Sequence, residues 1–277
     1  DQSSEGVYLD GKKNGIWKTY LNGEVLSEIE YKNDVFNGIY KDQSSEGVYL
    51  DGKKNGIWKE VSKIENLRDS SLNNYNLIIE GNFKNDIKNG QWSFIIDKSS
   101  KIIDSSSKKI FIMNCTYENG ILNGPFKLEN DFDEIDSRLL YKIKYDNLDT
   151  SSILNSLDVD QKFTLYNHEL VEGFFEKGKK KGKFILYDNS SLKVKIENYK
   201  NGLKNGQSVT FHRSIFSPEI PFDLNNKDFH KTINSFTINN YKNDKLDGET
   251  LYYVKVRDMK TGEFSFSPYL IENYENG

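Results

Sequence analysis

A ten-residue segment near the start of the chain, Tyr8 to Trp17, constrains the fold more than any other feature. It reads Tyr-Leu-Asp-Gly-Lys-Lys-Asn-Gly-Ile-Trp, so polar residues separate two short runs that carry aromatic rings. Asp-Gly and Asn-Gly between such runs are the strongest short-range signal for a β-hairpin. Full copies of the pattern begin at Tyr8, Tyr31, Tyr49, Phe83, Tyr117, Phe175, Tyr199 and Tyr241. The chain is therefore predicted to be an array of one small unit.

Two glycine positions define each copy. The second position is glycine in all eight full copies, at Gly15, Gly38, Gly56, Gly90, Gly124, Gly182, Gly206 and Gly248. The first position holds either glycine or aspartate, as at Gly11 and Asp34. Both residue types tolerate a left-handed backbone, so we predict a positive φ at both positions. We place both positions, and the residues between them, in the hairpin turn.

A third glycine precedes the first aromatic residue of several copies by two positions. It is found at Gly6, Gly47, Gly81 and Gly173. Residues two apart on a strand share a face, so this glycine is expected to leave room for a ring on the neighbouring strand. Rings at fixed places on successive hairpins are expected to stack into a ladder across the sheet.

The pattern resembles a known repeat family. Aromatic-x-Asn-Gly-x-x-x-Gly-x-aromatic, preceded by Glu-Gly, is similar to the membrane occupation and recognition nexus (MORN) repeat. The form Tyr199 to Gly206 most resembles the bacterial YwqK-like antitoxin variant. The commonest MORN form has a further glycine two residues after the second one, where this chain has Trp17, Trp58, Trp92 or Phe184. The resemblance implies one β-hairpin per repeat, joined edge to edge in a long sheet.

The predicted fold is therefore all-β: an elongated, single-layer, twisted antiparallel sheet of consecutive hairpins with loop insertions. Residues 1–277 are expected to form one array. A degenerate ninth copy is expected near Tyr145, and insertions at about residues 60–79, 129–170 and 212–240. Residues 1–18 and 42–59 are identical, which indicates either a recent duplication or an error in assembling the sequence.

Composition narrows the classes of function. The net charge of -4 and a pI of about 5.6 argue against a nucleic-acid binder, which would carry a strongly basic face. Aromatic residues make up 13%, too many for a disordered chain. The lone Cys115 excludes an internal disulfide and is expected to be a small apolar residue of a strand. No apolar run approaches a membrane span and no signal peptide is recognised, so a soluble, cytoplasmic location is favoured, although a chain that starts inside the repeat leaves this open.

Catalytic motifs are not found in the sequence. The three histidines show no metal-ligand spacing, and no nucleophile elbow, phosphate loop or dinucleotide fingerprint occurs. We therefore expect no enzymatic activity, no cofactor, no metal and no small-molecule substrate.

The expected function is a protein-binding scaffold. Candidate partner contacts are Trp17, Trp58 and Trp92, although packing on neighbouring repeats is an equal reading of these rings. Candidate contacts to an anionic surface are Lys12, Lys13, Lys53, Lys54, Lys179, Lys180 and Lys181, which are expected in a row of hairpin turns. Alternative functions are an antitoxin or immunity protein that binds a toxin, as the resemblance implies, and peripheral binding to anionic lipid. Lysines that only keep a thin sheet soluble are the simpler reading of the same row.

Overall fold

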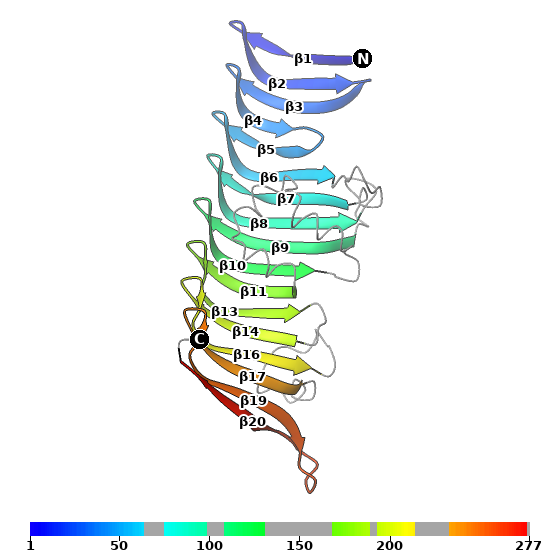
Figure 1. Cartoon of the computed structure of the whole chain (residues 1–277). Helices are drawn as coiled ribbons and strands as arrows, with labels where there is room; N and C mark the ends of the chain where they lie inside the picture. The colour runs from blue at the N-terminus through cyan, green and yellow to red at the C-terminus, as the bar shows by residue number, and fades with distance from the viewer. Residues whose placement is uncertain (64–74, 99–107, 131–167, 189–192, 214–232, 276–277) are drawn as a thin grey trace, which may run out of the picture. The chain divides into compact units, whose positions relative to one another are not determined.

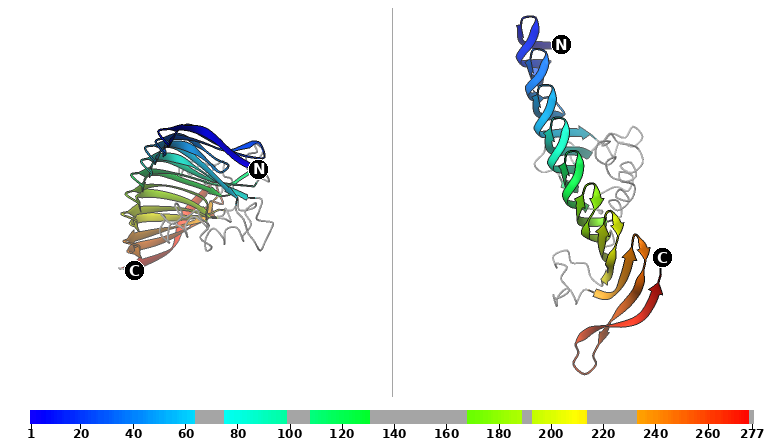
Figure 2. Two further views of the ribbon diagram at one scale, coloured as in Figure 1. Left: turned by 90° about the horizontal axis from the view of Figure 1, so that it is seen from above. Right: turned by 90° about the vertical axis from the view of Figure 1, so that its left-hand side faces the viewer.

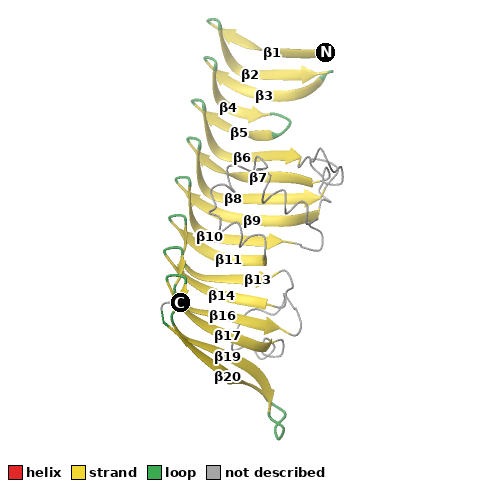
Figure 3. Ribbon diagram, viewed as in Figure 1, coloured by secondary structure: helices red, strands yellow, loops and turns green. Residues whose placement is uncertain are grey.

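The chain folds entirely into β-strands wherever its structure is described. The computed structural model describes residues 1–63, 75–98, 108–130, 168–188, 193–213 and 233–275. Within these ranges every regular element is a strand, and the connections are turns or short loops (Figure 3). The prediction of an all-β sheet of hairpins is confirmed.

The described residues contain twenty strands. They are β1 (Gln2–Leu9), β2 (Lys12–Leu21), β3 (Glu24–Lys32), β4 (Val35–Lys41), β5 (Ser45–Leu50), β6 (Lys53–Lys63), β7 (Tyr75–Lys84), β8 (Ile87–Lys98), β9 (Lys108–Glu118), β10 (Ile121–Asn130), β11 (His168–Glu176), β12 (Lys179–Lys180), β13 (Gly182–Asp188), β14 (Lys193–Lys200), β15 (Leu203–Lys204), β16 (Gly206–Arg213), β17 (Ile233–Lys242), β18 (Lys245–Leu246), β19 (Gly248–Arg257) and β20 (Phe264–Tyr274).

The strands form one open antiparallel sheet, and in the first unit strands that follow one another in the chain pair with each other. Its residues group into two compact units, Asp1–Gly124 and Pro125–Gly277. In the first unit, β1 to β9 lie side by side in chain order (Figure 1). In the second unit, three strands are each interrupted by a single residue and therefore carry two labels. They are β12 with β13, β15 with β16, and β18 with β19.

In every full copy of the pattern the hairpin closes with a two-residue turn. Both residues of the turn have positive φ, for example 50° at Asp10 and 75° at Gly11. Two positive φ values in a row are the geometry of a type I′ turn, whose twist suits a β-hairpin. In the first unit these turns follow one another along the same side of the sheet (Figure 2, right). The prediction of a left-handed backbone at the first glycine or aspartate of each copy is confirmed.

The second glycine also has positive φ in every full copy, but it does not lie in the turn as expected. Gly15, at φ 71°, lies inside β2, three residues after the strand has begun. Opposite it the register shifts: Glu5 pairs with Lys18 but Val7 pairs with Asn14, so one residue of β1 faces three of β2. The glycine therefore forms a bulge in the second strand, where a positive φ is needed to re-aim the chain.

The bulge lays an aromatic ring on the backbone of the preceding strand. A Cβ added to Gly6 would lie 2.2 Å from Cδ2 of Trp17, and one added to Gly47 would lie 2.3 Å from the same atom of Trp58. The indole Nε1 of Trp58 donates to the backbone carbonyl of Val48 at 3.1 Å. Gly81 with Trp92 and Gly173 with Phe184 repeat the contact. The prediction that this glycine leaves room for a ring is confirmed.

Successive hairpins are joined at their turns. The backbone N–H of Asp86 donates to the carbonyl of Lys54 at 2.9 Å. The carboxylate of Asp86 accepts from the Lys54 N–H at 2.7 Å. Asn55, just before the bulge glycine, accepts from the N–H of Asn85 at 3.1 Å and donates to the carbonyl of Lys53 at 3.1 Å. The recurring asparagine thus fixes the next turn instead of forming its own.

Parts of the three predicted insertions belong to strands. Strands extend to Lys63 and restart at Tyr75, extend to Asn130 and restart at His168, and extend to Arg213 and restart at Ile233. The outer parts of the segments predicted as insertions at 60–79, 129–170 and 212–240 are therefore strand, because the hairpins there are longer than in the first copies. The degenerate copy near Tyr145 lies outside the described residues.

Substituting alanine for Gly81 is expected to destabilise the protein severely. The new Cβ would lie 2.1 Å from Cδ2 of Trp92, so the ring must leave its place, at a cost of about 3 kcal/mol. Urea unfolding followed by circular dichroism measures this change. Trp92→Val removes the ring with which the new Cβ would clash. Gly81→Ala is therefore expected to cost less in a Trp92→Val background than in the wild-type protein. Additive losses would contradict the ring-on-glycine contact.

Replacing Asn55 by alanine is expected to lower the free energy of unfolding by about 1–2 kcal/mol, because its side chain donates to Lys53 and Asn85 and accepts from the N–H of Asn85 in the next hairpin. Asn55→Asp is the matched control, since Asp247 occupies this place in the last full copy. The aspartate keeps the acceptor and is expected to cost less. Equal losses for the two variants in urea unfolding would show that the bond to Asn85 is unimportant.

Candidate interaction surfaces

In the first unit, one face of the sheet carries the aromatic ladder and is called the ring face. Tyr8 and Trp17 have ring centroids 4.9 Å apart, and Phe83 and Trp92 repeat this distance. Links between hairpins include Phe36 to Tyr49 at 5.0 Å. In the second unit, considered by itself, Phe126, Phe175, Phe184 and Tyr199 follow at 5.3, 5.6 and 5.2 Å. The predicted ladder of rings is found within each unit, with the rings mostly meeting edge to face rather than stacked.

Lysines are part of the ring face. The Nζ atom of Lys54 lies 4.4 Å from the Trp58 ring centre and 5.4 Å from that of Phe83 in the next copy. Lys13 lies in the same way between Trp17 and Tyr31, at 4.4 and 5.0 Å. A cation above two ring faces is attracted by both, so each such lysine joins two hairpins.

This placement corrects the predicted lysine row. The turn is only two residues long, so the paired lysines that follow it belong to the second strand and point to opposite faces. Lys13, Lys54 and Lys180 lie over rings, and Lys180 is only 7% exposed. Lys181 pairs with Glu176. Only Lys12, Lys53 and Lys179 remain as exposed strand residues on the opposite face.

Lys88 also lies among the rings, on β8. Its Nζ lies 4.9 Å from the Trp92 ring and 5.2 Å from that of Tyr117, among buried neighbours. Burial lowers the pKa of Lys88 to about 8. Burial likewise raises the pKa of the Cys115 thiol to about 12, and Cys115 is a buried residue of β9 as predicted. Both groups are packed inside the ladder.

In the second unit a buried carboxylate is fully paired. Glu197 accepts from the hydroxyl of Tyr199 at 2.5 Å and from Lys204 Nζ at 2.7 Å. Burial opposes its ionisation, but the charge of Lys204 and these bonds together hold the pKa of Glu197 below its usual value. Because Glu197 and Tyr199 lie on β14 and Lys204 lies on β15, the carboxylate holds the two strands of one hairpin together.

The opposite side of the sheet in the first unit, called the open face, carries aliphatic side chains. Ten of them are between 45% and 69% exposed: Val7, Leu9, Ile16, Val35, Ile39, Val48, Leu50, Ile57, Ile87 and Ile121. Ile39 and Val48 lie directly opposite each other on β4 and β5. Ion pairs lie among them, such as Lys41 with Glu46 at 3.4 Å. The sequence search for rings and lysines missed this row, although alternation with the aromatic positions would have found it.

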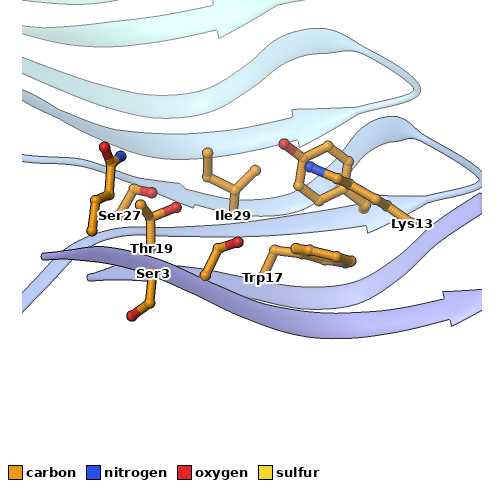
Figure 4. A pocket seen from close by; sticks show the side chains of 9 residues that line it. Ser3, Lys13, Trp17, Thr19, Ser27 and Ile29 are labelled. Carbon is orange, nitrogen blue, oxygen red and sulfur yellow. The ribbon is translucent and has the colours of Figure 1, made fainter. Parts of the chain in front are cut away.

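The three predicted tryptophans differ in exposure. Trp58 is 2% exposed and Trp92 is 4% exposed, so neither presents its ring to a partner and both pack on neighbouring repeats instead. Trp17 is only half-buried. It borders a hollow of about 350 Å³ on the ring face of β1 to β3 (Figure 4). Thr19, Ser27 and Ile29 line this hollow beside the ring.

The described part of the chain contains no group of three or more histidine, cysteine, aspartate or glutamate side chains placed to hold a metal ion. No helix long and apolar enough to span a membrane is found among those same residues.

Comparison with known proteins gave no match, either to a model of a protein family or to a curated protein.

Replacing Lys88 by leucine is expected to raise the free energy of unfolding at pH 7 by about 1 kcal/mol. The pKa of Lys88 falls from 10.5 to about 8 on folding, so its charge is a cost that is fully present below pH 8. The cost disappears as the pH rises toward 10.5, and the gain from leucine should shrink over that range. Leu122 already occupies this place in the next copy.

The matched control is Lys54→Leu, because Lys54 pairs with Glu60 at 2.7 Å and its loss leaves that carboxylate alone. We expect no gain in stability there. Urea unfolding at several pH values compares the two variants. A gain for Lys88→Leu that does not change between pH 7 and pH 10 would contradict the titration of a charged lysine at this place.

Proposed function

We propose that the chain is a non-enzymatic scaffold that holds a protein partner on the open face of its first unit. The observation that supports this is the row of ten aliphatic side chains, each about half exposed, on one face of one sheet. Some of these side chains lie next to each other, as Ile39 does to Val48, and neighbouring exposed apolar side chains on one face are typical of a binding surface. On the ring face, by contrast, large side chains such as Trp58 and Trp92 are buried.

A protein partner fits this surface better than a membrane. Aliphatic side chains alternate here with opposite charges, as in the pair Lys18 and Glu28 at 3.4 Å. Mixed charges around apolar residues favour a partner of complementary pattern. Binding to anionic lipid would rely on the exposed lysines, and three of the seven proposed for that role lie over rings instead.

An antitoxin or immunity role is one case of the same proposal. Such a protein must also hold another protein on an exposed face, and the open face offers the apolar contact that tight binding requires. The proposal therefore concerns the surface first and the class of partner second.

A polar open face is expected to lose the partner. Ile39→Ser, Val48→Ser and Ile57→Ser together change three exposed side chains, so the fold should be kept, with an unchanged circular dichroism spectrum. Affinity purification with mass spectrometry is expected to show one partner at least about tenfold depleted on the variant. The matched control is Val254→Ser with Val256→Ser, which changes exposed side chains of β19 in the second unit.

The same set of captured proteins on the wild-type chain, the triple variant and the control would contradict the proposal. Sedimentation with vesicles tests the lipid alternative separately. Binding to anionic vesicles that Lys12→Gln, Lys53→Gln and Lys179→Gln abolish, with no protein lost from the triple variant, would favour the membrane.

A further inference from the structure

The open face of the first unit carries unpaired lysines at the end of its strands that lies next to the turns. Each of these lysines is one residue away from a ring-face residue, such as Lys54 or Phe83, and therefore points to the opposite side. None of them forms an ion pair within the described part of the chain. They are the exposed residues Lys12, Lys32, Lys53 and Lys84.

The lysines alternate with aliphatic side chains in a row across the strands. Each lysine stands directly opposite an aliphatic residue across its turn, as Lys53 does opposite Leu50. Val35 and Ile87 pack toward the turn of the following hairpin, because a Cβ added to the turn glycine there would lie 3.3 or 3.4 Å from their side chains. On β3 to β8 this row, called the turn row, consists of Lys32, Val35, Leu50, Lys53, Lys84 and Ile87.

At the other end of the same face the charges are paired. Lys18 forms an ion pair with Glu28, and Lys41 forms one with Glu46, both at 3.4 Å. Exposed aliphatic side chains such as Ile39 lie between these pairs and the turn row. The open face therefore has unpaired lysines on one side of its aliphatic side chains and neutral ion pairs on the other.

We propose that the partner of the open face is an amphipathic helix of another protein that lies across the strands with an acidic flank along the turn row. This rests on the proposed function, because it names what occupies the surface proposed there. The apolar residues of the helix cover the aliphatic side chains, and its carboxylates meet the lysines. Opposite charges beside an apolar contact fix the orientation of a partner and exclude partners of the wrong charge.

The backbone of the sheet favours a helix over an extended segment. The strands β3 to β8 use their N–H and C=O groups to pair with each other, so the face offers only side chains to a partner. An extended segment buried there would leave its own backbone groups unpaired, whereas a helix bonds them internally. The spacing also agrees, since two strands span about 9.6 Å and seven helical residues rise about 10.5 Å. One heptad of the helix thus faces one hairpin.

The turn aspartates favour a protein over an anionic membrane. Asp34 and Asp86 lie in the turns, where their carboxylates accept from the N–H groups of Lys13 and Lys54 at 2.7 Å. Aspartate also occurs in two further turns of the first unit. A flat anionic surface pressed against this edge would meet these carboxylates together with the lysines. A helix that lies on the strands meets the lysines and avoids the turns.

The probe is a designed helical peptide of three heptads with leucine along one stripe and glutamate along one flank of that stripe. A matched peptide has lysine in place of each glutamate. Fluorescence anisotropy measures the binding of both to the 277-residue chain. The acidic peptide is expected to bind, and the lysine peptide to bind at least about tenfold more weakly, with a difference that shrinks as salt is added. Equal binding of the two peptides, or no binding of the acidic one, would overturn the inference.

The protein variant is Lys53→Gln with Lys84→Gln, which changes two exposed side chains and is expected to keep the circular dichroism spectrum. It should weaken the acidic peptide by about tenfold. The matched control is Lys242→Gln with Lys245→Gln, two exposed lysines that face each other across a turn of the second unit. An equal loss of binding for the two variants would show a general charge effect and contradict the assignment to the turn row.

The same lysine variant separates this inference from the proposed function. A protein that is lost from the serine variant of Ile39, Val48 and Ile57 but kept by the lysine variant would leave the proposed function standing and rule out an acidic helix. Lysine-dependent binding to anionic vesicles without binding of the acidic peptide would overturn the inference in favour of a membrane. Self-association that the lysine variant abolishes, again without peptide binding, would show a second copy of the chain on this face instead.

Discussion

Four of the hairpins depend on the same contact, in which an aromatic ring lies on the backbone of a glycine in the neighbouring strand. The glycines are Gly6, Gly47, Gly81 and Gly173. A single layer of sheet has no second layer to cover its large side chains, so the sheet must bury them on itself. Removing one Cβ lets the ring of Trp58 approach the main chain at Gly47, where any other residue would overlap it. The indole N–H then finds a carbonyl acceptor within the same hairpin. The bulge glycine is needed because it turns the second strand so that the ring arrives at that place.

One position of each copy, five residues after its first aromatic residue, places its side chain between successive rings of the ladder. Side chains of different chemistry occupy this position. Lys54 uses its long aliphatic stem and its charge there, and Phe36 fills it with a ring. Leu122 occupies it as a buried aliphatic side chain. A lysine at this place gains attraction to two ring faces but loses hydration, as the low pKa of Lys88 shows. The repeat thus tolerates a charge in its interior because the rings around it partly replace water.

Neighbouring hairpins bond to each other. The exposure of a side chain therefore depends on the hairpins before and after its own. The backbone of each turn is held by the preceding hairpin, as Asp86 is held by Lys54. Stability then accumulates from one copy to the next, as in other repeat proteins. Trp58, for example, is buried by Tyr40 of the preceding hairpin and Phe83 of the following one. The interaction surfaces follow from the same arrangement, since one face is filled by rings and the other keeps its aliphatic side chains in water.

Several features were predictable from the sequence because they depend on the local backbone. Glycine at the recurring positions permits the positive φ that a turn or a bulge needs. Glycine two residues before an aromatic indicates that a ring from the next strand lies over it. Hairpins, an all-β fold and the ladder follow from these positions, and all are found in the described residues. The exposed aliphatic row was also predictable, because aliphatic residues such as Leu50 alternate with ring residues such as Tyr49 and must therefore lie on the opposite face.

Only the tertiary structure decided which glycine makes the turn and which makes the bulge, since both need the same φ and the register of the paired strands chooses between them. The same register places Lys13 over rings and leaves Lys12 in water, although the two residues are chemically identical. It also buries Trp58, because Tyr40 of the neighbouring strand β4 packs on its ring. The sequence by itself determined how each hairpin bends and what it carries, whereas contacts between hairpins determined which of those side chains remain available to a partner.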